Sequence, residues 1–265
     1  MKLFTPAEKA LAEKDFRETW SSKMARGTLI AMPLLLVILL PIVYLVIVLT
    51  VPIREMNGVD AMLKLLPAEA AGYDLRQSMF YVMVNGLCPM FFLLVPLMSS
   101  SVSAASSFVG ERERGTLETL LLTPLGVRQI FKAKVAGCMA LSAAATAISF
   151  AAFAVVISVG DILLGLPFFL NWNWLVLLFL LAPGVTALGV IFMVLVSGKS
   201  KSYTESVQTS GYLVLPVVCL FLGQFTGLFR LSALFLLFVA LGVLAADVLL
   251  GLFASRSFQA EKLLR

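Results

Sequence analysis

The run Glu111–Arg114 alternates acidic and basic side chains and lies between two long apolar segments. Its acids can pair with basic groups of a partner, and its arginines with acidic ones. Histidine is absent from the chain, which excludes histidine-ligated metal sites and histidine-dependent catalytic triads. The cysteines Cys88, Cys138 and Cys219 lie in apolar runs without metal-ligand spacing. The residues therefore predict ion pairing with a partner, and neither a catalytic group nor a metal site.

The charged run opens a motif, residues 110–124, that predicts a short amphipathic helix. Gly115 breaks the charged run, and the hydroxyl of Thr116 can cap a helix start. The leucines of residues 117–121 have helical spacing, and Pro124 ends the helix. A helix this short is unstable alone in water, so we expect it to pack against other elements. We call residues 110–124 the charged motif.

The composition is that of an integral membrane protein. The 265 residues are 60% hydrophobic and 13% charged, with a mean hydropathy of +1.01. Soluble domains have about 45–50% apolar and about 25% charged residues. About 20 consecutive apolar residues cross a bilayer as a helix, and this chain has several such runs.

The predicted fold is a single all-α membrane domain over residues 1–265. Residues 1–27 are polar and contain Phe16 and Trp20 at a spacing of four, which favours a helix on the membrane surface. Six apolar runs predict transmembrane helices at 28–51, 78–108, 135–159, 174–196, 206–222 and 231–254.

The distribution of basic residues predicts the orientation. Sixteen of the 20 lysines and arginines lie in the two terminal segments, in and after the charged motif, or near residues 197–205. Basic residues concentrate on the cytoplasmic side, so both termini and the charged motif are predicted to be cytoplasmic. The net charge of +5 then reflects cytoplasmic loops and no nucleic-acid partner. Trp172 and Trp174 are placed at the outer interface, where tryptophan is enriched.

The charged motif, with Lys132 and Lys134 after it, resembles the cytoplasmic signature of type-2 ABC-transporter permeases. The bacterial export members similar to the NatB-type permeases carry a closely related run. The six-helix layout, with the motif between the second and third helices, extends the resemblance along the chain.

The resemblance implies a permease that exports a substrate across a bacterial plasma membrane. The chain would bind no cofactor and would not be an enzyme by itself. Two copies of a separate ATPase subunit would bind ATP and Mg²⁺, and a second permease copy or a related chain would complete the complex. The motif would be the coupling helix, which transmits movement of the ATPase. Its expected coupling residues are Glu111, Arg112, Glu113, Arg114, Gly115, Thr116, Leu117, Glu118 and Leu121.

A second cytoplasmic loop is a weaker candidate for ATPase contact, through Lys199, Lys201 and Glu205. This loop contains Gly-Lys-Ser, but the glycine that a phosphate-binding loop needs five positions earlier is replaced by Met193. The chain therefore has no nucleotide site of its own.

Polar residues inside the predicted spans are the last group of candidates. Asp247 is an acid in the sixth span, and Asn85 and Gln208 can line a path or form interhelical hydrogen bonds. Pairing of Asp247 with a basic residue such as Lys132, Lys134 or Arg256 is an equally good interpretation.

Two other functions remain open at this point. One is a non-transporting immunity or sensor component of an ABC-like complex, since a fold alone does not separate it from an exporter. The other is an intramembrane enzyme, which the absence of histidine disfavours.

Overall fold

The computed structural model describes residues 5–52, 66, 70, 72–116, 122, 125–198, 200, 202–226, 228–229 and 231–257. Within these ranges every regular element is a helix, and six helices are long and apolar enough to cross a membrane. The predicted all-α fold with six spans is therefore confirmed.

Each span is made of one or more consecutive elements. The first span consists of α2 (Lys23–Pro33), η1 (Leu34–Leu39) and α3 (Leu40–Thr50), and the second of α5 (Leu75–Val82), η4 (Met83–Leu87), α6 (Cys88–Ala104), η5 (Ala105–Val109) and α7 (Gly110–Glu113). The third is α9 (Val127–Leu164), and the fourth consists of α10 (Trp172–Val176), η6 (Leu177–Leu181) and α11 (Ala182–Ser197). The fifth consists of α12 (Tyr203–Ser210), η7 (Gly211–Leu213) and α13 (Val214–Phe225), and the sixth is α14 (Ala233–Ser257).

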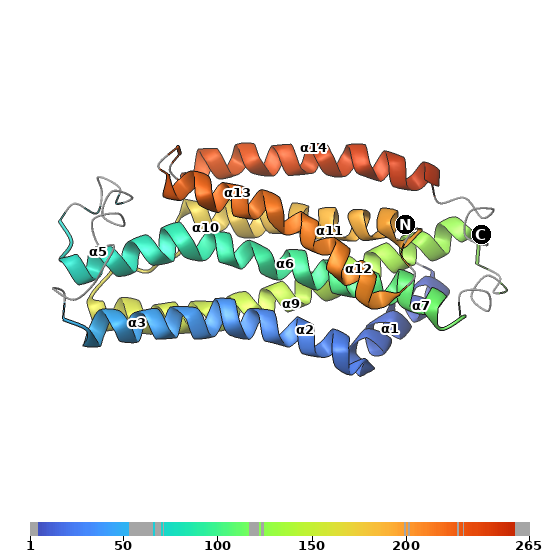
Figure 1. Cartoon of the computed structure of the whole chain (residues 1–265), viewed down its shortest axis with the longest axis horizontal. Helices are drawn as coiled ribbons and strands as arrows, with labels where there is room; N and C mark the ends of the chain where they lie inside the picture. The colour runs from blue at the N-terminus through green and yellow to red at the C-terminus, as the bar shows by residue number, and fades with distance from the viewer. Residues whose placement is uncertain are drawn as a thin grey trace.

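The six spans run side by side along the long axis of the molecule (Figure 1). The second span is the most buried of the six and packs through α6 against both α9 and α11. One end of the bundle carries α7 and α1 (Pro6–Ser21), and we call it the motif end. The opposite end, where α5 begins, is called the far end.

Three spans widen just before a proline. Proline lacks an N–H and its ring collides with the carbonyl four residues earlier. The π-helical segments η1, η4 and η6 each end two residues before Pro41, Pro89 or Pro183. There the backbone bonds span five residues, as from Leu40 N–H to Leu35 O. The helices thus pass these prolines without breaking.

Two predicted span boundaries are wrong at the motif end. The second span was predicted over residues 78–108, but its helix runs from Leu75 to Glu113. The third was predicted from residue 135, but α9 already begins at Val127. Apolar content was the criterion for the predicted ends, whereas both helices continue through polar residues that pack against α1.

Helix α1 starts with a reciprocal capping box between Thr5 and Glu8. It ends at Ser21 and is separate from the first span. It packs along α9, where a Cβ atom built on Gly137 would lie 3.3 Å from Ala12 Cβ. The absence of a side chain at Gly137 therefore permits this close approach.

An aromatic cluster fills the far end of the core. The Trp174 ring lies 4.9 Å from Phe153 and 5.8 Å from Phe92, centroid to centroid. Trp174 is fully buried, whereas Trp172 is 75% exposed. The side chains of α10 thus face opposite ways within one helical turn, and the position of both tryptophans at the outer interface stays a prediction.

Candidate functional site

The charged motif begins inside a helix. Gly110–Glu113 form α7, the last turn of the second span, so the separate helix predicted to begin at residue 110 is wrong at its start. Gly115 has a φ of +70°, a left-handed conformation that favours glycine. The N–H groups of Gly115 and Thr116 bond back to Arg112 O (3.1 Å) and Glu111 O (3.0 Å), which closes the helix.

Thr116 has a different role from the predicted cap. Its hydroxyl donates to Glu111 O at 3.2 Å, at the end of the preceding helix. Leu117, Glu118 and Leu121 lie outside the described residues, so the helix predicted after Thr116 stays a prediction. The described part of the motif is a helix end whose position relative to the bundle is fixed by side chains.

Glu111 provides the main attachment of that helix end. Its side chain is fully buried, and Lys134 Nζ of α9 lies 2.7 Å from its Oε2 atom. The two groups form an ion pair. Lys134 Nζ also donates to Ser107 O at 2.8 Å and lies 3.4 Å from Asp15 Oδ2. Helices α7, α9, α1 and η5 therefore meet at one lysine.

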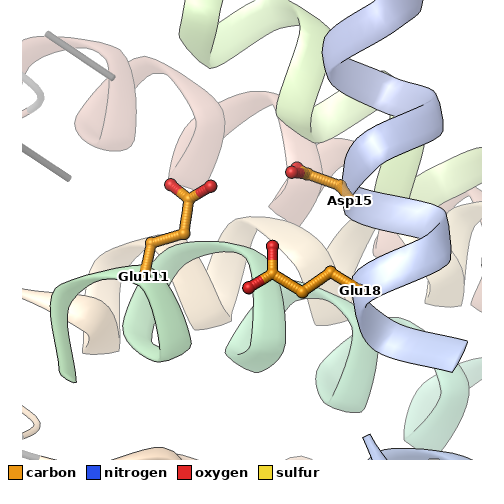
Figure 2. Close-up of side chains that lie close together, drawn as sticks. All are labelled: Asp15, Glu18 and Glu111. Atoms are coloured by element: carbon orange, nitrogen blue, oxygen red, sulfur yellow. The ribbon is translucent and has the colours of Figure 1, made fainter. Parts of the chain in front are cut away.

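Three carboxylates lie together here, and Figure 2 shows them pointing toward one another from α1 and from the end of the second span. They belong to Asp15, Glu18 and Glu111, with one oxygen of each within 4.8 Å of the others. Three cations accompany them. Lys134 pairs as above, Lys14 Nζ lies 2.5 Å from Glu111 Oε1, and Arg114 pairs with Glu18. We call these six residues the ion-pair cluster.

The ion-pair cluster has equal numbers of acids and bases. A divalent metal would have to compete with ammonium and guanidinium groups that already neutralise the carboxylates. The arrangement therefore favours a structural joint between helices over a metal site.

Burial and neighbouring charges shift the pKa values of two residues of the ion-pair cluster, Asp15 and Lys14. Burial raises the pKa of Asp15 above its ordinary value of 3.8, although the Lys134 charge and the Ser107 hydrogen bond oppose this shift. Burial lowers the pKa of Lys14, but the hydrogen bond and charge of Glu111 outweigh it, so the net pKa is raised above 10.5. Lys14 therefore stays charged at neutral pH.

The Asp15 shift predicts a pH dependence of stability. The folded protein holds this proton more tightly than the unfolded chain, so Asp15 makes stability fall as pH rises from 3.8 through the raised pKa. Asp15→Asn cannot titrate and keeps an acceptor for Ser107. As the pH rises from about 4 to about 7, we expect the apparent melting temperature to fall further in the wild type than in Asp15→Asn. Equal pH slopes for the two proteins would contradict this, and exposed Asp74→Asn serves as the control.

The charged motif also holds the loop before α12. Arg112 donates to Ser197 O at 3.2 Å, and Glu113 accepts from Tyr203 N–H at 2.9 Å. The sequence suggested the charged motif and the loop at residues 197–205 as two separate ATPase contacts. These two hydrogen bonds join them. Lys199 and Lys201 lie outside the described residues, and Glu205 is exposed on α12.

These contacts revise the proposed pairing of the motif with a partner. Glu111 is fully buried, so the idea that it meets basic groups of a partner is wrong. Arg112, Glu113, Arg114 and Gly115 are exposed and remain accessible to a second chain.

Sequence reasoning missed the role of α1. The membrane-surface interpretation relied on Phe16 and Trp20, which are indeed exposed and stacked. The opposite face buries Leu11, Asp15 and Thr19. Their spacing of four was the available signal, but two of the three are polar and do not stand out as a core stripe.

The polar residues of the spans do not form one site. Asn85 accepts a hydrogen bond from Asn171 at the far end, at 2.6 Å, while Gln208 is exposed on α12. Asp247 is buried on α14, and neither of its carboxylate oxygens has a hydrogen-bond partner among the described residues. Its suggested pairing with Lys134 is wrong, since Lys134 belongs to the ion-pair cluster.

The comparison with known families agrees with this architecture. A family model described as ABC-2 family transporter protein matches residues 9–229, a stretch that extends from α1 beyond α13. No curated protein matches the chain. The match covers most of the sequence, and the described residues include six helices long and apolar enough to cross a membrane, so the chain belongs to the ABC-2 family of transporter proteins.

Proposed function

We propose that this chain is the permease subunit of an ABC exporter driven by a separate ATPase. Two ATPase subunits bind ATP and Mg²⁺, and a second permease copy or a related chain completes the transporter. The motif end and both termini face the cytoplasm of a bacterial cell, as the distribution of basic residues predicts. Residues Arg112–Leu121 form the contact with the ATPase.

The observation that carries this proposal is the anchoring of the charged motif. A flexible loop would absorb the movement of a partner as conformational freedom. Here Glu111 is held by Lys14 from α1 and by Lys134 from α9, while Arg112 and Glu113 hold the loop before α12. A force on the exposed helix end therefore reaches the second, third, fourth and fifth spans together.

The coupling role predicts that deletion of residues 115–118, or Glu118→Lys, strongly reduces ATP-driven transport. Both changes leave all six residues of the ion-pair cluster in the chain, so we expect the permease still to fold and to insert into the membrane. We expect at least about a tenfold loss of flux, within the range of known coupling factors. The measurement is ATP-dependent transport in proteoliposomes that contain the permease and its co-purified ATPase.

Glu13→Lys is the matched control, because it makes the same charge change at a 64% exposed side chain of α1. It should transport normally. Normal flux in the deletion variant, or failure of any ATPase to co-purify with the wild type, would refute the proposal.

A further inference from the structure

A small cavity lies at the far end of the bundle, away from the charged motif. Its volume is about 190 Å³. An engineered protein cavity of about 150 Å³ binds benzene, so this space suits a small organic molecule. Its lining includes the side chains of Tyr73, Tyr81, Asn85, Asp161, Phe168 and Asn171.

Asp161 brings a carboxylate to this cavity. The residue is only 6% exposed, and its Oδ2 atom accepts a hydrogen bond from Phe169 N–H at 3.0 Å. None of the described lysines or arginines lies within ion-pair distance of it, and none lines the cavity. A buried carboxylate without a cation is costly, so a ligand that supplies positive charge is favoured.

The two amides of the cavity are already occupied by structural hydrogen bonds. Asn171 Nδ2 donates to Asn85 Oδ1, and Asn171 Oδ1 accepts from the N–H groups of Asn173 and Trp174 at the start of α10. Asn85 Nδ2 in turn donates to Tyr81 O at 3.2 Å. These amides shape the wall, which leaves the carboxylate as the group that selects the charge of a ligand.

Aromatic rings form much of the remaining wall. The rings of Tyr73 and Tyr81 are 5.6 Å apart at an angle of 59°, and Phe168 is 62% exposed, so the cavity opens to the surface beside it. Aromatic faces attract organic cations, most strongly where water is partly excluded. A single carboxylate does not supply the six to eight oxygens that Ca²⁺ takes, which disfavours a hard metal ion.

We propose that this cavity is a binding site for a small monovalent organic cation of the alkylammonium type. Asp161 neutralises its charge, and Tyr73 and Tyr81 contact its alkyl groups. The site lies at the end opposite the ATPase contact, so ligand binding there requires neither ATP nor a partner chain.

Equilibrium binding of radiolabelled choline to the purified full chain in lipid nanodiscs tests the site. Choline should bind saturably. Its uncharged analogue 3,3-dimethylbutan-1-ol, equal in shape, should compete at least about tenfold more weakly. Asp161→Asn keeps an acceptor for Phe169 N–H but removes the charge, and should weaken choline binding at least about tenfold. Tyr73→Leu should weaken it about threefold or more through loss of the ring.

Asp74→Asn is the matched control, since it removes the same charge at an exposed position just before α5 and asparagine serves equally well at a helix start. It should bind choline as the wild type does. Equal competition by the uncharged analogue, or absence of saturable choline binding to the wild type, would overturn the proposal even if Asp161→Asn failed to fold. Because the assay contains no ATPase, its outcome is independent of the coupling experiment.

Discussion

Lys134→Met is expected to reduce the free energy of unfolding by about 3–5 kcal/mol, the usual cost of removing one partner from a buried ion pair. Lys134 is 2% exposed and has four oxygen neighbours, from Glu111, Asp15 and two atoms of Ser107. Without its charge, Glu111 and Asp15 remain buried, and among the described residues Lys14 is the one other base in ion-pair contact with Glu111. The measurement is the denaturant midpoint of the purified protein in detergent.

The exposed pair between Arg17 and Glu13 provides the control. Its side chains are 77% and 64% exposed, so Arg17→Met should cost no more than about 1 kcal/mol. Combining Lys134→Met with Glu111→Gln should recover part of the lost stability, because the second change removes the unpaired charge. A Lys134→Met protein as stable as the Arg17→Met protein would contradict the stabilising role of the ion-pair cluster.

A disulfide between Ala12→Cys and Gly137→Cys is expected to form in nearly every molecule and to leave ATP-driven transport intact. The Cβ separation of 3.3 Å is close to the ~3.5–4.5 Å of natural disulfides. Helices α1 and α9 share Lys134 and Asp15, so they should move as one unit during transport. Crosslinking by a mild oxidant in a Cys219→Ser background, followed by a flux assay, measures both parts.

The pair Glu13→Cys with Gly137→Cys is the matched control, because Glu13 is adjacent in sequence but exposed. It should remain reduced under the same oxidant. Two results would contradict the shared movement of α1 and α9: low crosslinking of the designed pair, or loss of flux that returns when the disulfide is reduced.

Hydrophobic run length was sufficient to predict the six spans, since a bilayer requires about 20 apolar residues per helix. The helix ends were harder to predict. Gly110–Glu113 are polar, and residues 127–134 mix apolar side chains with three basic ones, so the hydropathy signal ends before the helix does. One side of each segment packs against α1, where Glu111 meets Lys14 and Lys134 meets Asp15, and nothing in the sequence of either segment predicts that contact.

The candidate site shows still more clearly which features follow from the sequence and which depend on the tertiary structure. The sequence alone determined that the charged motif alternates in sign and is followed by a glycine and a threonine, and Gly115 fulfils its local role at the helix end. The tertiary structure decided which charges are buried. Lys134 and Asp15 are 119 residues apart in the chain, and their pairing depends on α1 packing on α9. Local residue types set which bonds a side chain can make. Only the packing of distant helices removes water from Glu111, and its charge then connects helices of the bundle instead of facing solvent.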